Sequence, residues 1–201
     1  MAEFAPHFPE DFDGKVNLMI LGEAPGAEEE KQGLPFVGMS GKLLGKALEE
    51  AGFPREKLYI SNVFWSRPPE NNVAYFFCKK SSDEEKAEGY PLYKGMHLKA
   101  KWSNQLFRLE EELKMLEPEV VLAVGATPLW ALTGRDKITA HRGDVYKIDG
   151  AVKYPGRMIA TFHPAYVLRN RQALDTMKQD INKAISLLDQ PPWEGESLFE
   201  K

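Results

Sequence analysis

The sequence predicts an α/β fold with three layers, in which a mainly parallel central sheet lies between two layers of helices. The first observation is that residues 16–21, 120–124 and 158–162 are short, near-continuous apolar runs. Such runs are typical of parallel strands buried on both faces, whereas half-exposed strands alternate apolar and polar residues. The second observation is that these runs alternate along the chain with stretches of helical periodicity, which is typical of a parallel sheet covered by helices.

In the first half of the chain, two strands and one helix are predicted. Residues 16–21 form the first strand, which runs into a turn rich in glycine and proline. Ser40 is the expected N-cap of a helix that has leucine and alanine along one face and stops at Gly52. Residues 58–63 form the second strand.

In the middle of the chain, residues 102–116 carry leucines at helical spacing and are predicted to form an amphipathic helix. Residues 120–124 form the third strand, which Gly125 stops. A short helix over residues 127–132 follows it.

In the last third, residues 144–148 and 152–153 resemble a hairpin closed by an Asp-Gly turn. Residues 158–162 are predicted to be a separate strand. The last helix is expected over residues 173–188.

The composition indicates one folded domain over residues 1–201. The chain is 43% hydrophobic and 28% charged, and 201 residues bury a core without a stabilising cross-link. The formal charge of −4 excludes a strongly basic protein that coats nucleic acid, although it leaves room for a local basic groove. Residues 70–101 mix aromatic and charged side chains and are expected to be a long insertion, and residues 190–201 a mobile tail.

Several cellular and chemical contexts are excluded by simple features of the sequence. No apolar run reaches the ~18 residues of a membrane-spanning helix. The N-terminal segment has neither the basic nor the apolar region of a signal peptide. We therefore expect a cytoplasmic, monomeric protein without membrane contact. Cys78 is the only cysteine, which excludes an internal disulfide and a cysteine-rich metal site.

Four short segments carry a specific resemblance. They are residues 22–26 (GEAPG), 34–38 (LPFVG), 62–69 (NVFWSRPP) and 162–169 (FHPAYVLR). The carboxyl ends of parallel strands meet at one edge of a sheet, so loops that follow such strands converge on one crevice. In order and spacing the segments resemble the uracil-DNA glycosylase superfamily, closest to its bacterial and archaeal family-four enzymes.

The resemblance implies a DNA-repair glycosylase whose partner is DNA containing uracil. Such an enzyme flips uracil out of the stack and hydrolyses its N-glycosidic bond, which leaves an abasic site without a lyase step. Three alternatives remain open at this point. The substrate could be another base, such as hypoxanthine, xanthine or a modified pyrimidine. The chain could be a catalytically weak DNA-binding module, or a binder of small phosphorylated molecules.

Five positions of the motifs are candidates for base binding and catalysis. Phe36 would stack on the flipped base, and the carboxamide of Asn62 matches uracil O4 and N3–H. His163 would stabilise the negative charge that develops on the departing base. Glu23 is assigned to positioning the water, and backbone amides around Ala24 to base O2. The competing interpretations are core packing for Phe36, an Asx-turn for Asn62 and a structural role for His163.

A second set of residues is expected to contact DNA around that pocket. Tyr166 and Leu168 would fill the space that the flipped base leaves, unless their loop only packs on its own helix. The remaining candidates carry a positive charge or a helix N-terminal N–H that suits a phosphate: Ser40, Lys42, Arg67, Arg142 and Arg169. The acidic run of residues 28–30 is expected to be a solvated loop, in which Glu29 braces the neighbouring segment.

The sequence departs from the family-four pattern in one respect. Those enzymes generally hold an iron–sulfur cluster on four cysteines, and no cysteine stands at the matching positions here, one of which is Ser66. We therefore expect no cofactor and no metal, with aromatic packing that includes Trp65 and Trp102 in place of the cluster. The insertion also lacks the basic run that surrounds a nucleophilic histidine in a covalently trapping relative, so His97 is not assigned that role.

Overall fold

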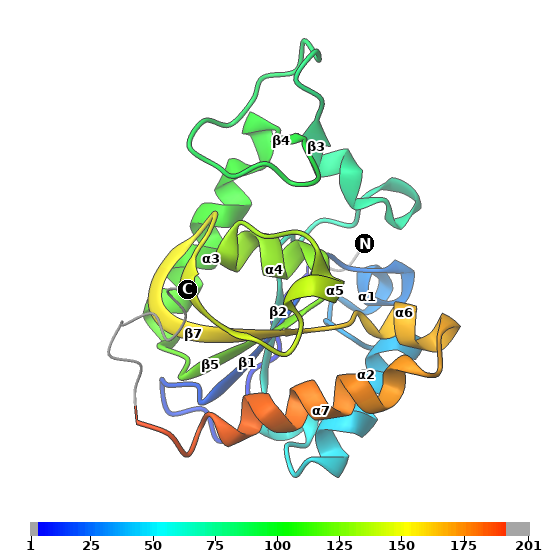
Figure 1. Ribbon diagram of the computed structural model, residues 1–201, viewed down its shortest axis with the longest axis vertical. Helices are drawn as coiled ribbons and strands as arrows, with labels where there is room; N and C mark the ends of the chain where they lie inside the picture. Colours follow the sequence, from blue (N-terminus) through cyan, green and yellow to red (C-terminus); the bar gives the residue numbers. More distant parts are fainter. Residues whose placement is uncertain (1–3, 192–201) are drawn as a thin grey trace.

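The computed structural model describes residues 4–191, and its centre is a five-stranded sheet (Figure 1). The strand order is β2-β1-β5-β7-β6, in which all neighbours are parallel except the antiparallel pair β6·β7. The strands are β1 (Leu18–Gly22), β2 (Tyr59–Asn62), β5 (Val120–Val124), β6 (Val145–Asp149) and β7 (Lys153–Thr161). The predicted α/β class with a mainly parallel sheet is confirmed.

Helices cover both faces of this sheet. In Figure 1, α3 and α4 lie above the sheet, and α2 and α7 lie below it. The helices are α1 (Ala27–Gln32), α2 (Met39–Glu50), α3 (Ser103–Leu116), α4 (Ala126–Thr133), α5 (Ile138–His141), α6 (Pro164–Arg169) and α7 (Ala173–Ser186). A short 3-10 turn, η1 (Arg55–Lys57), lies between α2 and β2. Within residues 4–191, no helix is both long and apolar enough to cross a membrane.

The central strands are apolar throughout because they supply two cores. Successive residues of a strand point to opposite faces. Met19 and Leu21 of β1 therefore pack with α3 and α4, whereas Leu18 and Ile20 pack with α2, α6 and α7. All four side chains are at most 1% exposed.

The predicted hairpin is confirmed, because β6 and β7 pair antiparallel, but the separation of its second arm from the last strand was wrong. Residues 153–161 form one continuous strand, β7, rather than two short ones. The pairing shifts between Lys147 and Ile148, where the register passes from Arg157 to Tyr154 on β7. This irregularity leaves Pro155 and Gly156 outside the ladder, so a proline without an N–H is accommodated inside a long strand.

Three local predictions near the helix ends were also wrong. Gly38, not Ser40, is the N-cap of α2, so Ser40 lies inside the first helical turn. The acidic residues 28–30 belong to α1, where three carboxylates in the first turn favour a helix N-terminus. Residues after His163 form α6, with Pro164 at the first helical position, where its missing N–H is tolerated.

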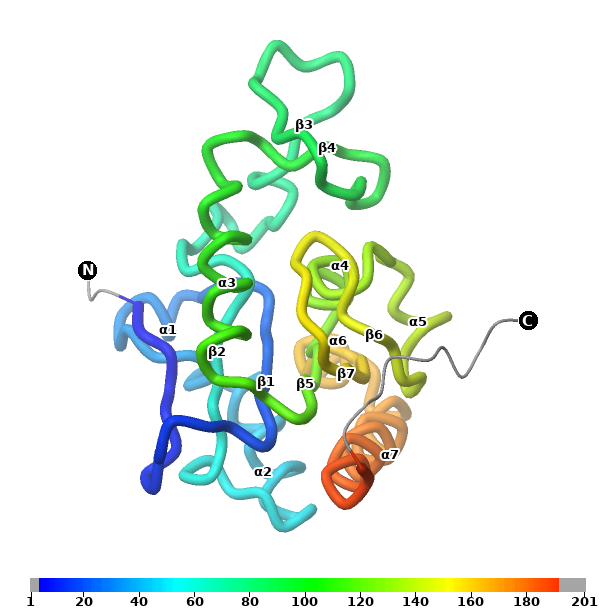
Figure 2. Tube along the Cα trace, turned by 90° about the vertical axis from the view of Figure 1, so that its left-hand side faces the viewer, coloured from blue at the N-terminus to red at the C-terminus, as the bar shows by residue number. Residues whose placement is uncertain are grey.

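The insertion of residues 70–101 rises from the domain and ends above α3 (Figures 1 and 2). It holds the short antiparallel pair β3 (Phe77–Cys78) and β4 (His97–Leu98). Single turns flank this pair: η2 (Pro69–Asn71), η3 (Val73–Phe76) and η4 (Ala100–Trp102). Phe76, Phe77 and Tyr93 are at most 3% exposed and join the same core cluster as Trp130 of α4. Most of the expected C-terminal tail, residues 192–201, lies outside the described residues.

Candidate functional site

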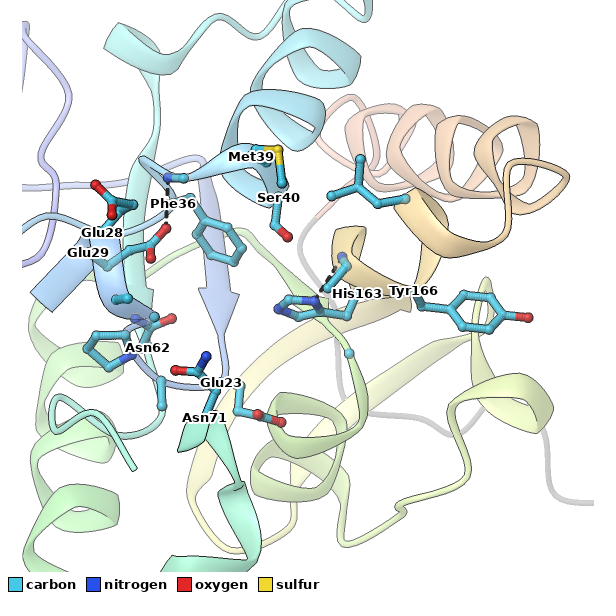
Figure 3. Close-up of a pocket in the computed structure, with 18 of the residues that line it drawn as sticks. Glu23, Glu28, Glu29, Phe36, Met39, Ser40, Asn62, Asn71, His163 and Tyr166 are labelled. Atoms are coloured by element: carbon cyan, nitrogen blue, oxygen red, sulfur yellow. Dashed lines mark hydrogen bonds between the residues drawn. The ribbon is translucent and has the colours of Figure 1, made fainter. Parts of the chain in front are cut away.

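A pocket of about 680 Å³ lies at the carboxyl ends of the central strands. Its walls come from the segments that follow β1, β2, β5 and β7, which is where ligands of open parallel sheets bind. Figure 3 shows Phe36, Asn62, Glu23 and His163 arranged around this space. The structure therefore brings together four residues that are far apart in the chain.

Phe36 forms one wall and is held in a strained backbone conformation. Its φ of +51° lies in the left-handed region, which a bulky residue rarely adopts. Arg55 donates to the carbonyls of Pro35 at 2.7 Å and Phe36 at 3.2 Å. Gly41 packs against the same carbonyl so closely that a Cβ there would lie 2.0 Å from the Phe36 oxygen. These contacts fix the backbone that carries the Phe36 ring.

Glu29 braces the same segment from the other side, as predicted. Its Oε1 accepts hydrogen bonds from the backbone N–H groups of Val37 at 3.1 Å and Gly38 at 2.9 Å (Figure 3). One of the three acidic residues of α1 thus has a local structural task, because it ties α1 to the start of α2.

Asn62 ends β2 and is 2% exposed. Arg108 donates to the Asn62 and Val63 carbonyls, both at 2.8 Å, which fixes the backbone that carries the amide. The side chain lies over Gly22, where a Cβ would lie 2.2 Å from Asn62 Oδ1 and 2.7 Å from the Phe36 ring. Gly22 is therefore the residue that lets Asn62 and Phe36 share one end of the pocket.

His163 lies across the pocket from Phe36, with 6.3 Å between the ring centroids. Its Nδ1 accepts the N–H of Ala165 at 3.1 Å, as the N-cap of α6 (Figure 3). Burial, together with the positive charge of Arg169, lowers the pKa of His163 to about 4. The imidazole is therefore neutral at pH 7, and because Nδ1 is an acceptor, the ring proton is on Nε2.

Two further features define the pocket floor. Gly125, with φ +106°, allows the close approach of His163, whose Cβ would lie 3.2 Å from a Cβ at this position. Glu23 follows β1, and its Oε2 accepts the Thr127 hydroxyl at 2.5 Å. Burial raises the pKa of Glu23, while the Thr127 hydrogen bond and the charge of Lys94 lower it.

The rim of the pocket carries exposed side chains. Met39 is 78% exposed and Tyr166 is 40% exposed. Leu168 and Arg169 line the rim from α6, and Ser40 lines it from the first turn of α2. The Tyr166 ring points away from His163 (Figure 3), so it is placed to meet a molecule that lies over the pocket rather than one inside it.

The comparison with known proteins places this geometry in a family. The family model for the uracil DNA glycosylase superfamily matches residues 9–187. The chain belongs to this superfamily. It is 35% identical over 177 residues to the type-4 uracil-DNA glycosylase of Thermotoga maritima, which covers 86% of this chain and 78% of the relative. It is 31% identical over 180 residues to the type-4 uracil-DNA glycosylase of Pyrobaculum aerophilum, covering 86% and 79%.

Three of the residues expected to bind DNA do not line the pocket of this superfamily member. Lys42 is exposed on α2. Arg67 donates to Glu30 at 3.0 Å and to Asn71 at 2.9 Å. Arg142 forms a two-point ion pair with the buried Asp180 of α7, which occupies its guanidinium group. A phosphate contact by these residues stays a prediction, and for Arg142 it would compete with an existing partner.

The motif analysis missed several residues that line the pocket of this chain. Asn71 lines it from the segment after β2, and Met39 lines it from the start of α2. Asn71 has a φ of +55°, a left-handed conformation that Asn tolerates better than most residues. The sequence contained a signal for Asn71, which is a polar residue two positions after the Arg-Pro-Pro motif.

The residues of this chain do not fit the cluster that the family-four resemblance implies. The sequence has one cysteine, and Cys78 is buried in the insertion. Among residues 4–191, no group of three or more His, Cys, Asp or Glu side chains is placed to hold a metal ion. Beside Ser66, the backbone N–H of Trp65 donates to Gln105 Oε1 at 3.0 Å. The Trp65 ring packs on the Phe4 ring with 5.8 Å between centroids, and the Arg108 guanidinium lies 4.3 Å from its centroid. That such contacts take the place of thiolate ligands stays a prediction.

Proposed function

We propose that this protein excises uracil from DNA by hydrolysing the N-glycosidic bond of a flipped-out nucleotide. The observation that carries the proposal is the placement of His163, whose ring lies across the pocket from Phe36 and whose Nδ1 accepts the Ala165 N–H, which leaves Nε2 as the donor. The membership in the superfamily and the names of its type-4 relatives support the same substrate.

Base recognition falls to Phe36 and Asn62. A flipped uracil stacks on the Phe36 ring, while the Asn62 amide donates to O4 and accepts from N3–H. Cytosine has an amino group at position 4 and no proton on N3, so it leaves both amide atoms wrongly paired. The rigid support of both side chains makes this mismatch costly, since an unpaired buried polar group is expensive.

Bond cleavage relies on His163. When the C1′–N1 bond breaks, the electron pair leaves with uracil, and negative charge develops on O2 of the base. A preorganised Nε2–H donor that carries no charge of its own stabilises this anion without being titrated at neutral pH. Water then bonds to C1′, and Glu23 holds that water and receives its proton.

DNA is held by the rim rather than by the overall charge, which is −4. Tyr166 and Leu168 enter the duplex beside the flipped nucleotide, and Arg169 and the first-turn N–H of Ser40 contact phosphates. The proposal includes a monomer acting on DNA in the cytoplasm, associated with the nucleoid when it acts. It also includes the absence of an iron–sulfur cluster, which a stoichiometric iron content of the purified protein would contradict.

A cleavage assay tests the proposal. Fluorescent oligonucleotides, single-stranded or double-stranded, carry one uracil, hypoxanthine, xanthine or mismatched thymine and are treated with alkali after incubation. We expect strand scission at uracil and its loss in His163→Ala with folding retained. Scission only at another base would change the substrate, and no scission at any base would contradict the proposed activity.

A further inference from the structure

The insertion reaches the back of the pocket through one short turn. Residues 90–96 dock on α4, where the Trp130 indole donates to the Pro91 carbonyl at 3.0 Å. The backbone N–H of Lys94 donates to Asp136 at 2.6 Å. The Tyr93 ring packs on Trp130 with 5.7 Å between centroids. This segment is therefore fixed to the helix that begins beneath the pocket.

Tyr93 lies at the end of a hydrogen-bonded chain that leads to Glu23. Its hydroxyl lies 3.2 Å from Thr127 Oγ1, and Thr127 Oγ1 lies 2.5 Å from Glu23 Oε2. A threonine hydroxyl has one proton, and an ionised carboxylate only accepts. With Glu23 ionised, Thr127 donates to Glu23, and Tyr93 donates to Thr127. Both side chains are at most 1% exposed, so water does not compete for these bonds.

We propose that Thr127 and Tyr93 are positioning residues that hold the Glu23 carboxylate ionised and aimed at the attacking water. The insertion of residues 70–101 thereby contributes a positioning residue, Tyr93, to the active site. This inference rests on the proposed function, because it takes the role of Glu23 from there.

The charges around Glu23 explain why such support is needed. Burial favours the neutral carboxylic acid and raises the pKa of Glu23. The Thr127 hydrogen bond and the Lys94 ammonium oppose this shift. His163, across the pocket, is neutral and supplies no charge. Burial also raises the pKa of Tyr93, so its hydroxyl stays protonated and remains a donor at neutral pH.

The same helix offers a matched control for Thr127. Thr133 is also a buried threonine of α4, but its hydroxyl donates to the Leu129 carbonyl at 2.7 Å within the helix. Loss of the Thr133 hydroxyl removes this bond and the one it accepts from the Arg135 backbone N–H at 3.2 Å, without touching Glu23. In the insertion, Tyr90 is a partly buried tyrosine that packs on the same core and serves as the control for Tyr93.

The first test is the pH profile of single-turnover uracil excision. The acid limb of this profile is the pH range in which the excision rate falls because Glu23 becomes protonated. Thr127→Val removes a hydrogen bond to this charged group, so the acid limb should shift to higher pH by about one unit. Tyr93→Phe should move it in the same direction by a smaller amount. Thr127→Ser, which keeps the hydroxyl, should restore the wild-type profile, and Thr133→Val and Tyr90→Phe should leave it unchanged. Glu23→Gln should abolish the limb itself.

The second test does not depend on activity. Carbon-13 NMR follows the Glu23 carboxyl resonance, assigned by its disappearance in Glu23→Gln, through a pH titration of each folded variant. We expect a higher Glu23 pKa in Thr127→Val and Tyr93→Phe than in the wild type. An unchanged titration in both, or an equal shift in Thr133→Val, would overturn the inference. If the wild type excises no uracil, the proposed function fails, whereas the titration still decides whether the hydroxyl chain controls Glu23.

Discussion

Replacing Gly22 with alanine tests whether the pocket depends on the shared position of Asn62 and Phe36. Gly22 is the last residue of β1, directly beneath both side chains. The added methyl group would lie 2.2 Å from Asn62 Oδ1 and 2.7 Å from the Phe36 ring. Ordinary contacts begin at 3.4 Å, so both groups must move, and the amide must retreat by about 1 Å.

The size of the effect follows from this displacement. A misplacement of about 1 Å in a preorganised site costs on the order of 100-fold in rate. The fold should survive the change, because overpacking costs about 1–3 kcal/mol and the displaced side chains can shift toward the pocket. We therefore expect single-turnover uracil excision to be on the order of 100-fold slower in a variant that still folds.

Gly45→Ala provides the control for Gly22→Ala. Gly45 lies inside α2, and a Cβ there would meet nothing within 4 Å. An alanine in a helix interior stabilises by about 0.5–1 kcal/mol relative to glycine, so Gly45→Ala should raise the melting temperature and leave excision unchanged. Excision by Gly22→Ala within about threefold of the wild type would refute the reasoning, since 1 Å of displacement should cost much more.

Three further predictions concern stability. As the pH falls from 6.5 toward 4, the unfolded chain protonates the imidazole that the folded state keeps neutral, so the wild type should lose stability there and His163→Gln should lose less, as measured by urea unfolding across that range. Asp180→Ala removes the partner of Arg142 and of the Thr161 hydroxyl, and should cost about 3 kcal/mol in urea unfolding, whereas a loss below about 1 kcal/mol would contradict a structural role for this pair. Trp102→Ala removes an indole that packs edge-on against Phe76 at 5.0 Å, and should cost about 2–3 kcal/mol, whereas an unchanged melting temperature would show that this packing does not stabilise the insertion.

The fold class was predictable because burial on both faces leaves a local trace. Strands β1 and β5 are short apolar runs, and their carboxyl ends define the edge at which polar loops meet. Residues such as Asn62 and His163 could therefore be placed in one crevice before their distances were known. Their polar type at the end of a buried run was the informative feature.

Other features depend on partners that are remote in sequence. The ion pair between Arg142 and Asp180 joins residues 38 positions apart, so charge alone suggested a phosphate contact for Arg142. The chain from Tyr93 to Glu23 passes through Thr127, which is 104 positions from Glu23. Local patterns specify which residue can donate or accept, whereas the fold decides which partner it meets.

Helix ends and strand breaks were the least predictable local features. Ser40 has a good N-cap side chain, yet Gly38 takes this position because Glu29 accepts its N–H and Gly41 must approach Phe36. Residues 153 and 158–161 were predicted to belong to separate strands, but a bulge carries one strand past Pro155. In both cases tertiary contacts outweighed a local preference.

The most direct test of the central claim is mass-spectrometric detection of the released base. A duplex with one uracil is incubated with the wild type, His163→Ala and Asn62→Ala, and free uracil is quantified alongside abasic DNA. The account predicts equal amounts of free uracil and abasic sites with the wild type, and at least about 100-fold less with either variant in a folded state. Absence of free uracil with the folded wild type, or undiminished release by both variants, would contradict the account.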